Sequence, residues 1–179
     1  PLITTPRLIL RRPDKDDAVD IAFLANNPKI AAMVARMPHP YGLKDAHAFI
    51  ERNRDGGPNG SVYAVTLAAT GRFIGCAGLD SSKGSGLELG YWLGEPFWGQ
   101  GFATEAAHAL VDLAFEGTDV AMITAACRIS NPASRRVIQK SGFQHAGTGM
   151  MSSIAAGNVA IERFVLDRKT WASLRSWGR

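Results

Sequence analysis

The chain has 179 residues, of which 46% are apolar and 20% are charged, and its formal net charge is +4. This length and composition are typical of one globular domain spanning 1–179, and they exclude disordered and fibrous chains. No apolar run approaches the roughly 18 residues of a membrane-spanning helix, and the amino-terminal residues lack a signal-peptide pattern. We therefore expect a cytoplasmic protein that does not bind membranes.

Charge distribution and cysteine spacing exclude two further classes of function. The basic residues are scattered rather than gathered in a stripe with aromatic residues, so nucleic acid is not an expected partner, although the net charge favours an anionic ligand. Cys76 and Cys127 lie far apart without a Cys-x-x-Cys spacing. We expect them to be buried free thiols, and no metal site is predicted.

The first third of the chain predicts one strand followed by helices. Residues 7–12 alternate apolar and basic side chains, which is typical of a half-buried strand. Asp14 is the expected N-cap of a helix that continues to about residue 26, and helical patterns follow at about 28–36 and 43–54. The prolines and glycine of the segment MPHPYG force a break between these last two patterns.

The middle of the chain predicts three strands after the turn cluster RDGGPNGS. The runs SVYAVTLA (61–68) and RFIGCAGLD (72–80) are separated by the tripeptide ATG, which is typical of a hairpin. The segment SSKGSG then leads into a third run, LELGYWLG (87–94).

A long helix and a buried strand follow. Apolar residues recur at helical spacing from Phe102 through Leu110 and Leu113, and Gly117 is the expected C-cap. The continuous apolar run VAMITAACRI (120–129) predicts a central strand covered on both faces.

The last third predicts another helix, two strands and a closing helix. In NPASRRVIQKSGF, Asn131 is the expected N-cap, a proline occupies the first helical position and Gly142 ends the helix. Strands at about 143–149 and 158–166 flank a loop, SSIAAGN, and KTWASLRSW closes the chain as a short helix. This element order predicts an α/β fold with a mixed sheet of about seven strands and helices on both faces.

The segment WGQGFATEAAHAL (98–110) brings glycines directly against the start of a helix. Unpaired backbone N–H groups converge there and the helix dipole adds positive charge, so the turn predicts an anion site. A P-loop would require a lysine that is missing from this turn. A dinucleotide fingerprint would use Gly99 and Gly101, but Thr104 replaces its third small residue and Asp119 precedes the next strand, where the acid should follow it.

A pyrophosphate of a pantetheine cofactor fits the turn better. The residues WGQGFA match, at Gly101 and Ala103, the coenzyme A motif Gln/Arg-x-x-Gly-x-Gly/Ala of the GNAT N-acetyltransferases. Trp98 departs from this motif at its first position, which leaves the backbone amides unaffected. The segments LELGYWLGEPFWGQGFATEA and NPASRRVIQKSGF also resemble this family, most closely its branch of RimJ- and RimL-like ribosomal-protein acetyltransferases.

This resemblance implies a GNAT fold and direct transfer of an acetyl group from acetyl-CoA to an amine, without a covalent enzyme intermediate. It implies that the strand end at 92–93 and the turn hold the cofactor through backbone groups, and that an asparagine side chain contacts the pantetheine. The implied cofactor-binding residues are Trp92, Leu93, Trp98, Gly99, Gln100, Gly101, Phe102, Ala103, Thr104 and Asn131.

Two residues are candidates for the chemistry. Glu88 shares one face of its strand with Gly90 and Trp92, and it is the candidate base, acting directly or through water. The alternative for Glu88 is an exposed residue or one paired with an arginine. Ser134 matches the serine that this branch is thought to use as proton donor to the leaving thiolate, and Tyr91 is the alternative acid.

Other candidates have simpler roles. Cys127 lacks the neighbours that would activate it as an acyl nucleophile, and Glu105 is expected to balance the dipole of its helix. His39 and Tyr41 either line the acceptor pocket or belong to a plain connecting loop.

The expected partner is an amine acceptor. A protein N-terminus is favoured by the RimL-like resemblance, and the alternatives are a small amine such as an aminoglycoside, a polyamine or an amino-acid-like compound. A different alternative is a sensor domain that binds coenzyme A without catalysis. Both a monomer and a homodimer are compatible with the sequence.

Overall fold

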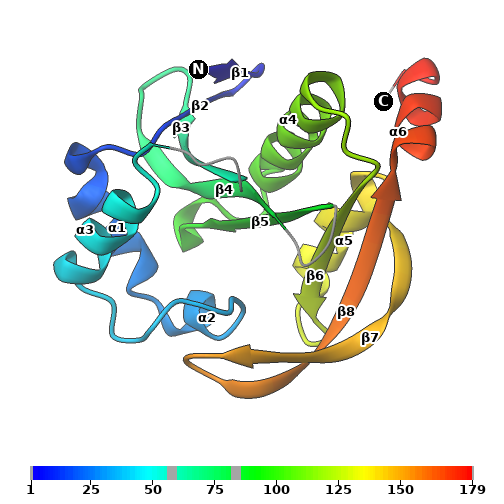
Figure 1. The fold of residues 1–179 in the computed structure, drawn as a ribbon. Helices are drawn as coiled ribbons and strands as arrows, with labels where there is room; N and C mark the ends of the chain where they lie inside the picture. The colour runs from blue at the N-terminus through cyan, green and yellow to red at the C-terminus, as the bar shows by residue number, and fades with distance from the viewer. Residues whose placement is uncertain (1, 56–59, 82–85, 179) are drawn as a thin grey trace.

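One mixed sheet of eight strands organises the computed structural model, which describes residues 2–55, 60–81 and 86–178 (Figure 1). The strand order is β1-β2-β3-β4-β5-β6-β8-β7, and all neighbours are antiparallel except β5 and β6. The predicted α/β class is confirmed, and the two-residue β1 adds a strand at the edge. The strands are β1 (Ile3–Thr4), β2 (Leu8–Arg11), β3 (Gly60–Leu67), β4 (Phe73–Ser81), β5 (Leu87–Leu93), β6 (Met122–Arg128), β7 (Gln144–Ser153) and β8 (Gly157–Asp167).

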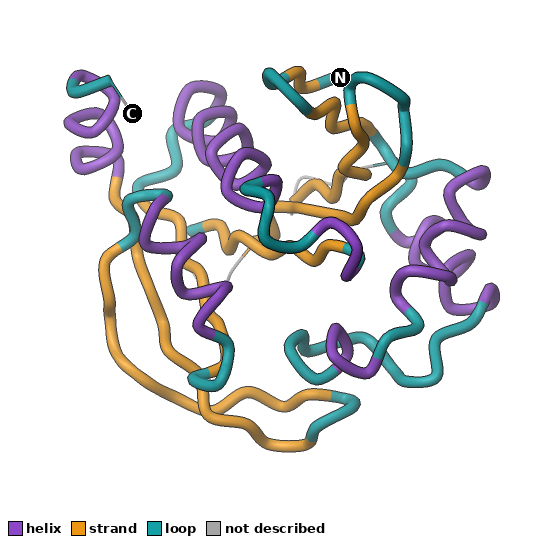
Figure 2. The backbone as a smooth tube through the Cα atoms, turned by 180° about the vertical axis from the view of Figure 1, so that it is seen from behind, coloured by secondary structure: helices purple, strands orange, loops and turns teal. Residues whose placement is uncertain are grey.

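Helices cover both faces of this sheet. On one face, α1 and α3 pack over β3 and β4 around a core that includes Ile21, Ala64 and Cys76. On the opposite face, α4 and α5 enclose a larger core that includes Leu110 and Phe164, and Figure 2 shows these two helices in front of the strands. The helices are α1 (Ala18–Ala25), α2 (Pro28–Ala31), α3 (Leu43–Arg52), α4 (Phe102–Gly117), α5 (Pro132–Lys140) and α6 (Arg168–Ser176), with single 3₁₀ turns η1 (Lys15–Asp17) and η2 (Glu95–Phe97).

Within the described part of the chain, no helix has the length and apolar character that crossing a bilayer requires. The predicted caps at Asp14 and Asn131 are confirmed, since each side chain accepts a backbone N–H of the following turn. The predicted C-cap at Gly117 is wrong. Gly117 is the last residue of α4, and Thr118 caps the helix by donating its hydroxyl to the Ala114 carbonyl at 2.7 Å.

Two predictions of burial are also corrected. Strand β6 is central in the sheet, but its side chains alternate between buried and half-buried, so only one of its faces is fully covered. Leu113, expected in the apolar stripe of α4, is 41% exposed. The predicted loose loop SSIAAGN is a tight turn, because β7 and β8 pair as far as Ser153 and Gly157.

Strands β5 and β6 diverge after a short stretch of parallel pairing. They pair only from Leu87–Leu89 to Ile123–Ala125, whereas β5 continues along β4 to Leu93 and β6 continues along β8 to Arg128. The backbone groups that face the gap beyond Leu89 therefore have no strand partner. We call this gap the β5–β6 opening; it interrupts the middle of the sheet (Figure 1).

The segment 32–37, which we call the arch, closes one side of this opening. It was predicted as the end of a helix over 28–36, but α2 ends at Ala31. Three carbonyls of the arch instead accept hydrogen bonds from β6 and the β7–β8 hairpin. The bonds run from Arg128 Nη1 to Ala32 O at 2.9 Å, from Ser153 Oγ to Val34 O at 3.1 Å and from Ile154 N to Ala35 O at 2.9 Å.

β5, one of the two strands beside the opening, approaches β4 closely because β4 has a glycine at position 75. A Cβ at Gly75 would overlap the carbonyl oxygen of Trp92, whereas a Cβ at Gly90 would meet nothing within 4 Å. We expect Gly75→Ala to lower the free energy of unfolding by about 3 kcal/mol, because neither backbone can move aside. Gly90→Ala is the matched control and should change it by less than about 0.5 kcal/mol. Urea denaturation measures both, and equal effects would contradict this packing.

Candidate active site

The glycine turn ends in a left-handed backbone at the start of α4. Gly99 has φ +75° and Gly101 has φ +82°, and Gly101 is the N-cap residue of the helix. Residues other than glycine rarely adopt this backbone conformation, so the turn requires glycine at both positions. The turn thereby points successive N–H groups toward one side.

These N–H groups are free to bind a ligand. Among the hydrogen bonds of the described residues, none is donated by a backbone N–H between Gly99 and Thr104. α4 has 16 residues, and the positive end of its dipole lies at the same place. Converging free amides at a helix N-terminus form a site for an anion such as a diphosphate.

Arg7 braces the turn from the connection between β1 and β2. Its Nη1 donates to Gln100 O at 2.8 Å, its Nε donates to Glu105 Oε1 at 2.8 Å, and its guanidinium lies 4.4 Å from the centre of the Phe102 ring. Glu105 also accepts the Arg7 backbone N–H at 2.9 Å and the Thr5 hydroxyl at 2.5 Å. Sequence analysis missed Arg7 and Thr5, because nothing local relates them to a turn far along the chain.

Glu105 therefore does more than balance a helix dipole. Burial raises the pKa of this carboxyl, but the hydrogen bonds from Thr5 and Arg7 outweigh burial and hold the pKa below its usual value. The carboxylate fixes the first turn of α4 to the edge of the sheet.

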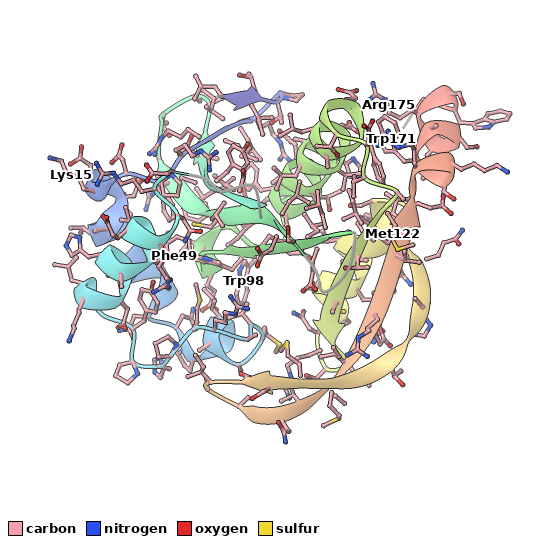
Figure 3. The ribbon with its side chains drawn as sticks, in the orientation of Figure 1. Lys15, Phe49, Trp98, Met122, Trp171 and Arg175 are labelled. Atoms are coloured by element: carbon pink, nitrogen blue, oxygen red, sulfur yellow. The ribbon has the colours of Figure 1, made fainter. Side chains whose placement is uncertain are left out.

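Trp98 connects the turn to the end of β5. Its indole Nε1 donates to Leu93 O at 2.8 Å while the side chain remains 43% exposed, and Figure 3 labels it close to β5. The Gly94 N–H donates to Ile74 O, so the antiparallel alternation turns the backbone groups of Trp92 toward β4. The groups that face the β5–β6 opening are those of Tyr91 and the N–H of Leu93.

Ser134 and Tyr91 meet on the face of the sheet covered by α4 and α5. The Tyr91 Oη lies 2.7 Å from Ser134 Oγ and 3.3 Å from Ser134 O. Asn131 Oδ1 accepts the Ser134 N–H at 3.2 Å, so the cap sets the position of the serine in the first turn of α5. The two residues that the sequence offered as alternative acids thus form one hydrogen-bonded pair.

Tyr91 keeps its proton at neutral pH. Burial raises the pKa of its phenol to about 12, although the hydrogen bond with Ser134 partly opposes the increase. The phenol stays protonated, and either hydroxyl can donate in the pair. When the phenol donates, the serine hydroxyl hydrogen is available to a further acceptor.

Glu88 lies on the opposite face of the sheet from this pair. Its exposed side chain is paired across the strands with Asp80 of β4 and Thr124 of β6, and it shares its face with Trp92, which packs against the α1–α3 core. The predicted alternation along β5 is confirmed. None of the ion pairs among the described residues includes Glu88, which excludes the alternative of a structural arginine pair within that part of the chain.

The structure places the remaining candidate residues in different surroundings. Burial raises the pKa of the Cys127 thiol, which disfavours the thiolate that a nucleophile needs. Tyr41 is 6% exposed within the α1–α3 core. His39 borders a hollow between the arch and the β7–β8 turn, together with Pro38 and Ile154. Among the described residues, no cluster of three or more His, Cys, Asp or Glu side chains could hold a metal ion.

The family of the chain follows from comparison with known proteins. Residues 7–144 match the family model described as an acetyltransferase (GNAT) domain. The chain belongs to the GNAT acetyltransferases. It is therefore an N-acetyltransferase, and the matched region includes the glycine turn, the β5–β6 opening and the Tyr91–Ser134 pair.

Relatives and solved structures of GNAT proteins span nearly the whole chain. The uncharacterized protein YkkB of Bacillus subtilis is 30% identical over 155 residues, covering 82% of this chain and 87% of its own length. The structure of a GNAT-family acetyltransferase from Bacillus anthracis superposes with a TM-score of 0.84 at 18% identity, over 94% of this chain and 99% of that chain.

Two further similar structures are of acetyltransferases whose acceptors or ligands are stated. RimL, a ribosomal L7/L12 alpha-N-protein acetyltransferase in complex with coenzyme A, has a TM-score of 0.78 at 18% identity and covers 93% of this chain and 98% of its own. Spermidine N-acetyltransferase from Vibrio cholerae, in complex with CoA and spermine, has the same TM-score and identity and covers 94% and 99%. These likenesses confirm the GNAT fold.

The raised pKa of Tyr91 predicts a loss of stability in alkali. The folded chain holds this proton more tightly than the unfolded chain, so the stabilisation is complete below pH 10 and is lost as the pH rises toward about 12. We expect Tyr91→Phe to reduce this alkaline loss of unfolding free energy by about 2 kcal/mol. Urea denaturation between pH 9 and pH 12 measures the slope, and identical slopes in variant and wild type would contradict the assignment.

Proposed function

We propose that the protein transfers an acetyl group from acetyl-CoA to a primary amine by direct attack, with a protein N-terminal amine as the favoured acceptor. The observation that carries this proposal is the run of unpaired N–H groups from Gly99 to Thr104 beside the β5–β6 opening. Amides at this position would hold a diphosphate, and the opening beside them would admit a pantetheine arm between two strands.

The chain offers groups to hold the diphosphate and the pantetheine arm of acetyl-CoA. The amides of the turn would bind the diphosphate, and the exposed rim of Trp98 would border it. The backbone groups of Tyr91 and the Leu93 N–H face the opening, where they would pair with the amides of the arm. Asn131 would contribute its side-chain N–H₂ to the same arm, because only its oxygen is used by the cap.

The acceptor amine must be deprotonated before it attacks. Glu88 would take this proton, directly or through water, from the face of the sheet opposite the Tyr91–Ser134 pair. An α-amino group ionises near pH 8 and needs less help than a lysine, which fits an exposed carboxylate as the base. The two substrates would then meet from opposite faces, with the reacting atoms aligned by the opening.

The leaving thiolate needs a proton on the other face. Ser134 would pass its hydroxyl proton to the sulfur, and a proton given up by the attacking amine would return to the serine through water, while the phenol of Tyr91 keeps its own proton and stays hydrogen-bonded to the serine. The buried phenol is a positioning residue in this arrangement, since it fixes the direction of the serine hydroxyl. This pair favours an enzyme over a sensor domain that only binds coenzyme A.

The acceptor is the least constrained part of the proposal. RimL supports a protein N-terminus, and the spermidine N-acetyltransferase supports a polyamine as the second candidate. The exposed acids Glu88 and Asp80 on the acceptor face are compatible with either amine.

The proposal is tested by release of free thiol from acetyl-CoA in the presence of N-terminal peptides or small amines. We expect turnover with a peptide, and loss of acetyl-CoA binding in Gly101→Val, because a branched side chain at φ +82° strains the turn and covers the amides. Gly117→Val at the far end of α4 is the control, since a Cβ there meets nothing within 4 Å. Normal affinity in Gly101→Val would overturn the cofactor assignment; binding without thiol release from any amine would favour the sensor.

Removal of the serine hydroxyl separates chemistry from binding. We expect Ser134→Ala to lower kcat about 100-fold, the usual scale of a lost proton donor, with little change in the Kd of acetyl-CoA. Tyr91→Phe should lower kcat less, and should add nothing in the Ser134→Ala background because it acts through the serine. Ser130→Ala, on the exposed turn just before the cap, is the control. Additive effects of the two substitutions on kcat would show that Tyr91 does not act through Ser134.

A further inference from the structure

The acceptor face carries two arginines, Arg128 of β6 and Arg163 of β8, beyond the point where β5 and β6 separate. Ile123, Ala125 and Cys127 of β6 are buried on the α4–α5 side, so Arg128 points to the other face, on which Glu88 lies. Arg128 pairs across the strands with Ile161 of β8, and Arg163 is two residues further along β8 on the same face. Diagonal neighbours of this kind lie within reach of long side chains.

The protein leaves Arg128 largely unsatisfied. A guanidinium has five N–H donors, and the acceptor found for this one is the arch carbonyl of Ala32. Its Nε is buried without a hydrogen-bond partner. The ion pairs among residues 2–55, 60–81 and 86–178 include neither Arg128 nor Arg163.

Two other arginines of the sheet and its helices have carboxylate partners. On the other face, Arg135 donates to Glu162 at 2.7 Å and to Ile129 O at 3.1 Å. Arg11 makes two bonds of 2.8 Å with Asp17. A cation that is partly desolvated without a carboxylate is costly, so the uncompensated charge at Arg128 indicates a missing anionic partner.

Arg163 has room beside it because of a glycine. Its guanidinium lies over Gly149 of β7, where any Cβ would overlap it, and its Nη1 points toward Thr148 O at 3.4 Å. The side chain is exposed. Its donors therefore remain accessible on the same face as Arg128.

Opposite charge lies at the other end of this face. Asp80 and Glu88 are directly paired across β4 and β5, and like charges in such a pair are unfavourable without a cation. Thr124, the β6 partner of Glu88, is four residues before Arg128, which is roughly 13 Å along a strand. An acceptor that spans the face would thus place its amine toward the acids and a negative group toward the arginines.

We propose that Arg128 and Arg163 form a subsite for a carboxylate of the acceptor whose amine is acetylated. This inference rests on the proposed function, because the amine must lie beside the β5–β6 opening. The carboxylate belongs either to the side chain of an acidic residue near a protein N-terminus or to a small amino-acid-like or dipeptide acceptor. Both sources present the same group to the two guanidinium forks.

Matched acceptors distinguish these sources. The first pair is Ser-Glu-Ala-Ala-amide and Ser-Gln-Ala-Ala-amide, and the second is Ser-Ala with a free carboxyl terminus and Ser-Ala-amide. We expect the carboxylate member of at least one pair to have a kcat/KM about tenfold higher in the thiol-release assay. The pair that shows the preference identifies the source.

Variants assign the preference to the arginines. Arg163→Gln, which leaves the arch bond intact, should reduce the ratio within the preferred pair at least about fivefold with a smaller change for the neutral member. Arg128→Lys keeps the charge but loses the two-pronged guanidinium, so it should also reduce the ratio. Circular dichroism and the Tm of this variant report whether the arch remains folded. Arg54→Gln, an exposed arginine beyond α3, is the control and should leave the ratio unchanged.

The outcomes separate this inference from the proposed function. Equal kcat/KM within both pairs, or ratios unchanged in Arg163→Gln, would overturn the subsite while acetyl transfer to the neutral peptides still stands. If no peptide is turned over, binding of the same peptides to the CoA-bound protein is measured by calorimetric titration. Carboxylate peptides that bind no more tightly than their neutral partners would then overturn the subsite. Failure of the protein to bind CoA would instead refute the proposed function.

Discussion

The early separation of β5 from β6 is the constraint on which the site depends. Two parallel strands that paired along their full length would satisfy each other's backbone groups and close the sheet. Here pairing ends at Leu89 and Ala125, and each strand continues with its outer neighbour. β5 stays paired with β4 and β6 with β8, while unpaired backbone groups face the gap between them. In the proposed function, a cofactor arm and an acceptor would approach this gap from opposite faces.

Contacts from distant segments hold the rims of this opening. Arg7 ties the glycine turn to the first strands through Gln100 and Glu105, and Trp98 ties the same turn to the last carbonyl of β5. On the other side, the arch is fastened to Arg128 and the β7–β8 hairpin. Most of these hydrogen bonds end on backbone carbonyls of the turn and the arch, which lie outside the helices and strands. Such contacts fix the position of the rims, which suits a reaction that relies on positioning.

The two faces of the opening differ in polarity, and this difference matches the two halves of an acyl transfer. The α4–α5 side is enclosed, and burial keeps the phenol of Tyr91 protonated beside Ser134. The other side carries exposed acids on β4 and β5, the exposed Arg163 of β8, and Arg128 of β6, whose Nε is buried without a hydrogen-bond partner. Proton donation to a thiolate fits the first environment. Recognition of a charged, water-soluble acceptor fits the second.

The sequence by itself determined the features that depend on near neighbours in the chain. These include the glycine turn before α4, the cap at Asn131, the alternation of faces along β5 and the α/β order of elements, because backbone sterics and side-chain period act within a few residues. Only the tertiary structure decided that α2 is short and that 32–37 forms an arch. It also brought Tyr91 to Ser134 and Arg7 to Glu105, which are 43 and 98 residues apart. Such contacts arise when packed elements meet in space, and no local spacing encodes which side chains then face one another.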